Sequence, residues 1–155
     1  MAALWRGVRT SSVRPALEAF FPEAAYAQVK AIADPHADYD DRLLADYRLD
    51  LAPAGALLGD HARDAKLVRA EVPEGLVHWV APGACYNRVG YYEVPNSRLI
   101  YRVGGEVRSF GIASLISWRG LWYVIHLGAV VRSGGEGVVD DPTVGSGSPA
   151  PSLTC

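Results

Sequence analysis

The residues that could perform acid–base or nucleophilic chemistry are few. Cys85, Asn87 and His126 are the residue types of a cysteine nucleophile set, whose members are brought together by folding and not by sequence spacing. A catalytic thiol must stay free and ionisable, so a disulfide at Cys85 would exclude this chemistry. His126 is also a candidate general base, or else a structural residue that makes a hydrogen bond within a strand. Its candidate polar partners are Ser109, Ser117 and Arg102.

The sequence contains no metal-binding or phosphate-binding pattern. His36, His61 and His78 have no second ligand at a His-x-x-x-His or Cys-x-x-Cys spacing. The acidic residues between 38 and 46 lack the Gly and the closing Glu of a calcium loop. The glycines between 134 and 137 lack the Lys of a phosphate loop. The sequence therefore predicts no metal and no cofactor.

Aromatic and arginine side chains are interleaved between residues 86 and 123, a composition that is typical of recognition surfaces. Core packing explains most of these aromatic residues, but one face of the predicted sheet is mixed in character. The residues that we predict for binding on this face are Trp122, Tyr91, Arg102 and His126. The expected partner is a small molecule, a glycan or a protein, and the same face could form a homodimer through the sheet.

Length and charge restrict the class of protein. With 155 residues, of which 50% are hydrophobic, the chain is long enough for one domain with its own core. A net charge of -2 provides no basic surface for nucleic acid. No run of about 18 apolar residues is present, which predicts no membrane span. Arg6 and Arg9 interrupt the first residues, so we expect any export segment to lie outside this sequence.

Two turns that contain glycine organise residues 99–127 into three antiparallel strands. The turns are Gly104-Gly105 and Arg119-Gly120, and the alternation of apolar and polar residues predicts the register around them. The predicted pairs are Leu99 with Phe110, Ile116 with Tyr123, Ser114 with Ile125 and Ile112 with Leu127. One face, which includes Leu121, is then wholly apolar, and we expect it to be buried. The reverse face is mixed, and Tyr91 and Trp122 are expected on it.

The first third of the chain predicts helices and the rest predicts strands. Helical patterns cover residues 16–20, 23–33 and 38–51, with Asp38 as the expected N-cap of the last helix and Pro53 expected to bend or end it. Further strands are expected at 67–72, 77–80 and 86–94, and a Pro95-Asn96 turn joins the last of these to residues 98–103. The predicted fold class is therefore α+β, with N-terminal helices packed on a curved antiparallel sheet.

This order of elements resembles the cystatin-like or NTF2-like cone, in which a sheet wraps around a helix. The resemblance covers residues 38–128, and its clearest part is the last strand, Trp118-Arg119-Gly120-Leu121-Trp122-Tyr123-Val124-Ile125-His126-Leu127. It implies a pocket inside the cone. Cyclases, isomerases, hydratases and plain binding modules share that fold, so the resemblance does not select an activity.

A second resemblance rests on residues 82–91, 109–110 and 113–128, together with a proline-rich C-terminus that ends in Cys155. These segments resemble an uncharacterised family of exported actinobacterial proteins. The resemblance implies a secreted or cell-envelope location and no reaction.

The composition changes after residue 132 to Gly, Ser, Pro and Asp, which predicts a domain at 1–132 followed by a tail at 133–155. The tail carries too little apolar surface for a core of its own. Cys85 and Cys155 are the two cysteines of the chain, and in an exported protein we expect them to form a disulfide that ties the tail back. The alternatives are an unpaired Cys85 with an unattached Cys155, or a lipid or intermolecular link through the C-terminus.

Two classes of function stay open at this point. The leading hypothesis is a non-catalytic, secreted or cell-envelope binding module, because the sequence shows no acid–base constellation. The alternative is a small-molecule enzyme of the NTF2-like type, a cyclase, isomerase or hydratase, with His126 as general base. A closed pocket with His126 among convergent polar groups would favour the enzyme.

Overall fold

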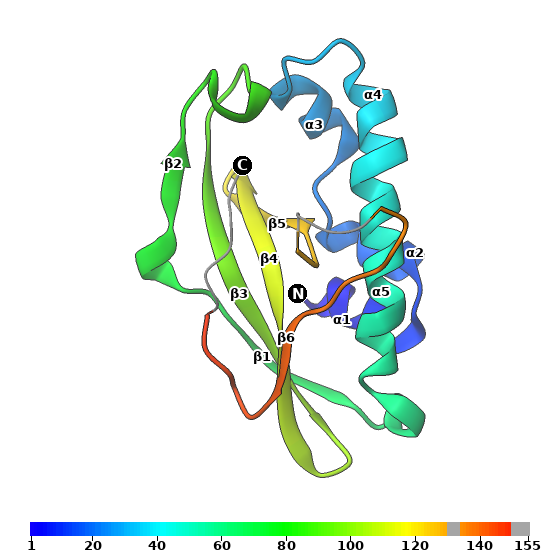
Figure 1. Ribbon diagram of the computed structural model, residues 1–155. Helices are drawn as coiled ribbons and strands as arrows, with labels where there is room; N and C mark the ends of the chain where they lie inside the picture. The colour runs from blue at the N-terminus through cyan, green and yellow to red at the C-terminus, as the bar shows by residue number, and fades with distance from the viewer. Residues whose placement is uncertain (130–133, 150–155) are drawn as a thin grey trace.

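The structure is a computed structural model that describes residues 1–129 and 134–149. Helices occupy the first part of the chain, and the strands that follow form an antiparallel sheet (Figure 1). The helices α2 to α5 lie on one side of this sheet. The α+β class predicted from the sequence is confirmed.

The helical part begins with α1 (Ala2–Thr10), α2 (Val13–Ala16) and α3 (Glu23–Val29). The chain then continues without a break through α4 (Pro35–Asp38), a π-helical turn (Tyr39–Leu44) and α5 (Ala45–Ala56). The predicted cap at Asp38 is wrong, because the carboxylate of Asp34 accepts the cap hydrogen bond from the Ala37 N–H at 2.9 Å. Pro35 occupies the first helical position, where its missing N–H costs nothing. Pro53 does not end α5, which continues to Ala56.

The sheet is built around a long hairpin of β3 (Tyr91–Val103) and β4 (Glu106–Trp118). Two short strands, β1 (Lys66–Glu71) and β2 (His78–Val80), pair with the free edge of β3. Two others, β5 (Leu121–His126) and β6 (Asp140–Val144), pair with the free edge of β4. Each long strand is therefore central, and its two halves have different neighbours.

Both predicted hairpin turns are confirmed. Gly104 and Gly105 have φ values of 56° and 85°, and Arg119 and Gly120 have 50° and 82°, as a two-residue turn of this hand requires. The pairs nearest the turns match the prediction: Leu99 with Phe110, Tyr101 with Arg108, Ile116 with Tyr123 and Trp118 with Leu121.

The predicted turn at Pro95-Asn96 is wrong, because β3 runs through it. Asn96 has a φ of 58°, a value that Asn tolerates better than most residues. The register is the same on both sides of this position, since Pro95 pairs with Ser114 and Ser97 with Ile112. A local left-handed residue therefore bends the strand without ending it. The predicted strand at 86–94 also begins later, at Tyr91.

The predicted register of β5 fails in its second half. Ser114 pairs with His126 and not with Ile125, because an irregularity between Ser114 and Leu115 adds one residue to β5. Beyond it, the Ala113 N–H donates to the Leu127 carbonyl at 3.0 Å, so the expected pair of Ile112 with Leu127 does not form. A bulge of this kind cannot be recognised from alternation alone.

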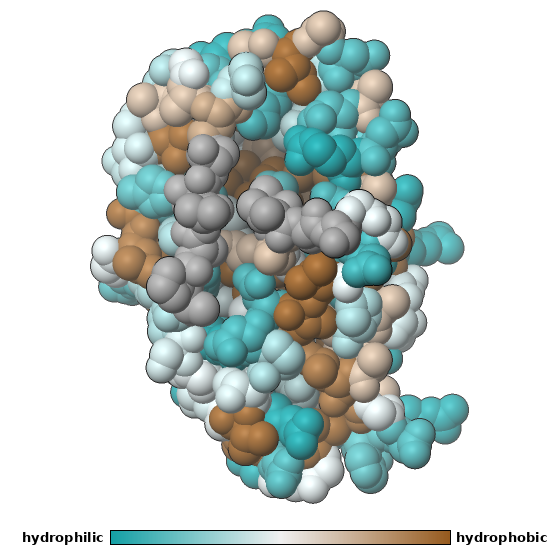
Figure 2. All heavy atoms as spheres, viewed as in Figure 1, coloured by the Kyte–Doolittle hydropathy of each residue, from teal (hydrophilic) through white to brown (hydrophobic). Residues whose placement is uncertain are grey.

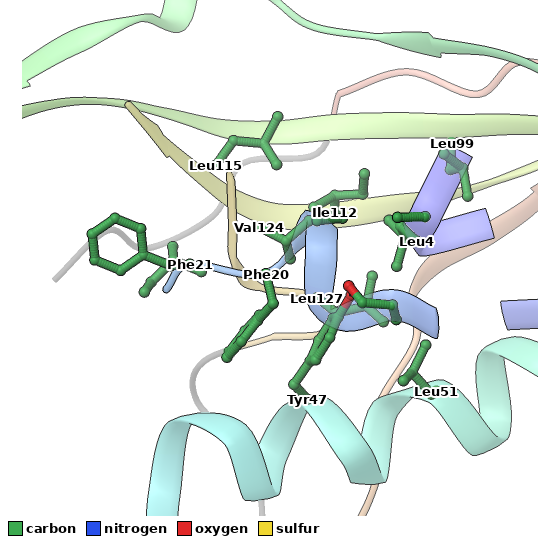
Figure 3. Packing of buried hydrophobic residues seen from close by; sticks show 14 of the residues in the cluster. Leu4, Phe20, Phe21, Tyr47, Leu51, Leu99, Ile112, Leu115, Val124 and Leu127 are labelled. Carbon is green, nitrogen blue, oxygen red and sulfur yellow. The ribbon is translucent and has the colours of Figure 1, made fainter. Parts of the chain in front are cut away.

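The core lies between the sheet and the helices (Figure 3). Phe20 stacks on Tyr47 of α5 with ring centroids 4.2 Å apart, and Trp5 of α1 lies 5.4 Å from Tyr101 of β3. The prediction of one buried face is only partly right. Leu121 is exposed, whereas Ile100 of the expected mixed face is fully buried. Other buried residues of that mixed face are Ala113, Leu115 and Val124.

The described part of the predicted tail adds a strand to the sheet and covers buried polar groups. β6 pairs with residues 108–111 of β4. Arg98, which is 2% exposed, holds this segment through Nη1 to Asp141 Oδ2 at 2.9 Å and through Nη2 to the Asp141 carbonyl at 2.8 Å. Asp50 of α5 accepts hydrogen bonds from the N–H groups of Gly128 and Val138. Long-range polar contacts thus order a segment that has no core of its own.

Candidate functional site

Three exposed aromatic side chains form a row across neighbouring strands. Trp79 of β2 pairs directly with Tyr92 of β3, and Trp122 of β5 pairs directly with Ser117 of β4. The Tyr92 N–H donates to Ser117 Oγ at 3.0 Å, which joins the two halves. Directly opposed residues share a face, so these four side chains lie together over three strand spacings, about 14 Å. We call this set the aromatic row.

The rings of the aromatic row are held in place although they are exposed. Trp79, Tyr92 and Trp122 are 53%, 51% and 42% exposed. Trp79 and Tyr92 meet edge to face, with centroids 5.0 Å apart and planes at 63°. A Cβ on Gly90 would lie 2.3 Å from the Trp79 ring, so only glycine lets this ring lie against the backbone. The row is therefore partly preorganised for a contact.

Aliphatic side chains extend the apolar surface next to β2. Val72, Leu76 and Val77 are exposed just before Trp79 in the chain. Figure 2 shows hydrophobic residues reaching the surface on the β2 side, whereas hydrophilic residues cover the outer side of α4 and α5. Exposed apolar patches of this kind mark contact surfaces in soluble proteins.

The structure separates the residues that were predicted to bind together. Trp122 is in the aromatic row, but Tyr91 is buried and pairs with Val80, so its neighbour Tyr92 takes the predicted place. Arg102 lies at the other end of the hairpin, where it donates to the Gly105 carbonyl. There it lines a hollow of about 340 Å³ together with His61, Asp64 and Lys66. Strict alternation counted back from the Gly104-Gly105 turn would have placed Tyr92 correctly.

The predicted polar partners of His126 do not converge on one point. Ser109 and Ser117 are both on β4, and eight strand residues span about 27 Å. Ser109 Oγ accepts hydrogen bonds from Arg98, and Ser117 Oγ accepts one from the Tyr92 N–H. His126 instead pairs with Ser114.

Two members of the cysteine set are close in the chain, and the third, His126, is the last residue of β5. Cys85 and Asn87 lie in the loop between β2 and β3, and Asn87 pairs with Lys30 through the backbone. Cys85 is half-buried against the core, and its carbonyl accepts a hydrogen bond from Lys30 Nζ at 2.9 Å. The predicted partner Cys155 lies outside the described residues, so the disulfide stays a prediction.

A buried polar cluster, which sequence reasoning missed, surrounds Glu93 of β3. Glu93 is 5% exposed, and its Oε1 accepts a hydrogen bond from Ser114 Oγ at 2.5 Å. His78 Nε2 lies 3.8 Å from Glu93 Oε2, too far for a hydrogen bond but close enough for an ion pair when His78 is protonated. The other ring nitrogen of His78, Nδ1, donates to the Leu76 carbonyl, which can only accept. Within the described chain, Ser114 is the single hydrogen-bond donor to Glu93.

Tyr91, Asn87 and Lys30 extend this Glu93 cluster. Asn87 is 2% exposed, its Nδ2 donates to Tyr91 Oη at 3.2 Å, and its Oδ1 has no partner among the described residues. Burial raises the pKa of Tyr91, and the charge of Glu93 raises it further. Burial lowers the pKa of Lys30, and the charge of Glu93 opposes this shift. The four side chains therefore share one low-dielectric region.

A third polar group connects α3 to the π-helical turn. Arg42 donates to both carboxylate oxygens of Asp38 and to Tyr26 Oη, and Tyr26 Oη donates to Asp38. The hydrogen bond from Arg42 is the main cause that lowers the pKa of Asp38. π-Helical turns are often found at functional sites, but here both carboxylate oxygens of Asp38 and the Tyr26 hydroxyl are paired within the fold. This group therefore has a structural role, fastening α3 to α4.

Comparisons with known proteins add no family. No family model, no curated protein and no solved structure matches this chain. In residues 1–129 and 134–149, no helix is long and apolar enough to cross a membrane. In the same residues, no three His, Cys, Asp or Glu side chains are grouped so that they could hold a metal ion.

Proposed function

We propose that this protein is a non-catalytic binding module and that its partner is a protein which places an uncharged, apolar surface on the aromatic row. The main support for this proposal is the row itself, in which three half-exposed rings and Ser117 lie side by side on four neighbouring strands. Trp and Tyr are enriched among the residues that dominate protein interfaces. Each of these side chains has two χ angles, so it loses little conformational entropy when it is immobilised on binding.

The composition of the surface defines the partner. The aromatic row contains no charged side chain, and its neighbours Val72, Leu76 and Val77 are aliphatic. An acidic or basic partner would lose solvation there without gaining an ion pair. For hydrogen bonds to a glycan, the row offers the Tyr92 hydroxyl, two indole N–H groups and Ser117 Oγ, which already accepts from the Tyr92 N–H, but no carboxylate or amide side chain. These features favour an apolar protein surface over a small polar ligand.

The experiment is a selection of displayed peptides on the purified protein, followed by affinity measurements on the variants Trp79→Ser and Trp122→Ser. We expect apolar peptides to be enriched and each variant to weaken binding by tenfold or more, about 1.4 kcal/mol or above. Val144→Ser is the matched control, because Val144 is exposed on β6, outside the row. Binding that both Trp variants retain would contradict the proposal.

Two further measurements test whether a second copy of the chain or a glycan binds the aromatic row instead. Sedimentation of the protein alone tests the predicted homodimer through the sheet: a dimer that Trp122→Ser dissociates would identify a second copy as the occupant. A panel of neutral oligosaccharides tests the glycan alternative. Saturable glycan binding that depends on Trp79 would replace the protein partner.

We also propose that the architecture is a cystatin-like or NTF2-like cone and that the protein is secreted or bound to the cell envelope. The bent β3–β4 hairpin and the helices on one side of the sheet support the first proposal. The presence of two cysteines supports the second, because disulfides persist in oxidising compartments. Peptide mapping without reductant on natively produced protein should recover Cys85 linked to Cys155, whereas two free thiols would contradict it.

A further inference from the structure

The pairing of Glu93 is incomplete for a buried carboxylate. A carboxylate has about four lone-pair directions, and burying its charge is costly unless these are filled. Across residues 1–129 and 134–149, Glu93 accepts one hydrogen bond, from Ser114, and His78 lies 3.8 Å away. Arg98 on the same strand shows that this fold can pair a buried charge completely. Oε2 of Glu93 thus has no hydrogen-bond partner among these residues, and it is not fully shielded from solvent, so a small donor can approach it.

A second unsatisfied acceptor lies in the same cluster. Oδ1 of Asn87 is buried without a partner in the described chain, and Nδ2 of the same amide contacts Tyr91 Oη. Tyr91 and Glu93 are two residues apart on β3, so their side chains point to the same face about 7 Å apart. Lys30, the nearby cation, already donates to the Cys85 carbonyl and lies over the Tyr26 ring. Among the described residues, no cation donates a hydrogen bond to the acceptors of Glu93 and Asn87, and Lys30 acts on Glu93 through its charge alone.

We propose that the Glu93 cluster is a binding site for a small organic ammonium ion, whose N–H groups fill the free acceptors of Glu93 and Asn87. A primary ammonium has three donors and one positive charge, which matches the vacancy. Ile116, which pairs with Glu93, and the Tyr91 ring are apolar and buried, so they suit an alkyl chain on the ligand. His78 is partly exposed and adjoins Glu93, so it lies on the route from solvent. This site is separate from the aromatic row.

The test is thermal denaturation of the full chain with n-butylammonium chloride as the probe. Two matched probes accompany it: n-butanol has the chain without the charge, and tetramethylammonium has the charge without N–H donors. We expect n-butylammonium alone to raise the melting temperature saturably, because a ligand that binds only the folded state stabilises it. Equal effects of the three probes, or no saturable effect of n-butylammonium, would overturn the proposal.

Variants test whether the rise in melting temperature comes from n-butylammonium bound at the Glu93 cluster. Glu93→Gln keeps an acceptor for Ser114 but removes the charge, and we expect it to weaken n-butylammonium binding by about tenfold or more. Asn87→Ser should weaken it severalfold, which provides a second variant if Glu93→Gln does not fold. Glu71→Gln is the control, because Glu71 is an exposed carboxylate on β1. If Glu93→Gln binds within twofold of the unmodified chain, the ammonium is held elsewhere and the assignment fails.

Discussion

Two buried charged residues of β3, Arg98 and Glu93, differ in how completely they are paired. Arg98 donates to Ser109 Oγ, to the side chain and carbonyl of Asp141, and to the Ser148 carbonyl. Glu93 accepts a single hydrogen bond, from Ser114, within the described residues. A fully paired buried charge connects two segments of the fold. A buried charge with few partners lowers the stability of the ligand-free protein, and a ligand that pairs with it would stabilise the folded state. The comparison assigns a structural role to Arg98 and a binding role to Glu93.

The largest expected effect comes from Arg98→Met. This change removes the hydrogen bonds from Arg98 to Asp141 and Ser148 and leaves Ser109 Oγ buried without its arginine donor. We expect the free energy of unfolding to fall by about 3 kcal/mol, as for other broken buried networks. Denaturant unfolding measures this loss, and hydrogen exchange should increase in residues 140–149.

Arg102→Met is the matched control for this prediction. Arg102 lies on the same strand, is exposed, and among the described residues donates to the Gly105 carbonyl alone. Its replacement should change the stability by less than about 0.5 kcal/mol. Equal losses for the two variants would show that burial and pairing do not distinguish these arginines.

A smaller effect is expected from Gly147→Ala, which acts on the same contact from the opposite side. A Cβ at Gly147 would lie 2.6 Å from Arg98 Cζ, and the φ of 66° is unfavourable for alanine. We expect a loss of about 2 kcal/mol in the free energy of unfolding. Gly145→Ala separates the two causes, because Gly145 has a φ of 80° but open space around it. The difference between the two variants measures the steric part.

The partly exposed pair of Asp38 and Arg42 should show a weaker, pH-dependent effect. Because the pKa of Asp38 is lowered in the folded state, its contribution is present above the ordinary value of 3.8 and is lost as the pH falls through the folded pKa. Arg42→Gln should therefore cost about 1 kcal/mol at neutral pH and less once Asp38 is protonated in both states, when the hydrogen bond from Arg42 to Tyr26 still contributes. Urea unfolding measured down the acid range checks this. A loss that is the same at every pH would contradict the assignment.

Apart from the control Arg102→Met, the smallest expected effect on stability is that of Glu93→Gln without ligand. Removal of an under-paired buried charge offsets the loss of a charged hydrogen bond, so the free energy of unfolding should change by less than about 1 kcal/mol or rise. Denaturant unfolding of Glu93→Gln and Arg98→Met under the same conditions compares their free energies of unfolding directly. A loss as large as that of Arg98→Met would mean that Glu93 is as fully integrated as Arg98.

Local features of the fold were predictable, and so was part of the aromatic row. Gly104-Gly105 and Arg119-Gly120 are turns whose positive φ values depend on the residues themselves, and they determine the nearest strand pairs. Trp122 was predicted as a binding residue on this basis. Tyr92 was missed because Pro95-Asn96 looks like a turn, whereas the pairing of β3 with β4 continues in the same register through the bend at Asn96.

The incorporation of β6 into the sheet could not be predicted in the same way. Residues 140–144 have little strand propensity, and Pro142 alone argues against a strand. They pair with β4 because they lie at an edge, where a missing N–H is tolerated, and because Arg98 holds Asp141. The composition of these residues predicts that they form no hydrophobic core of their own. It does not show whether the sheet has a free edge with which they can pair.

The sequence by itself determined the α+β class, the two tight turns and the register beside them, because these depend on residues close together in the chain. Only the tertiary structure decided which charges are paired. Arg98 meets Asp141 and Ser148, and Glu93 meets Ser114 and His78, across segments that are distant in sequence. The energy of a buried charge depends on the donors and acceptors that packing brings to it, and no local pattern encodes that set.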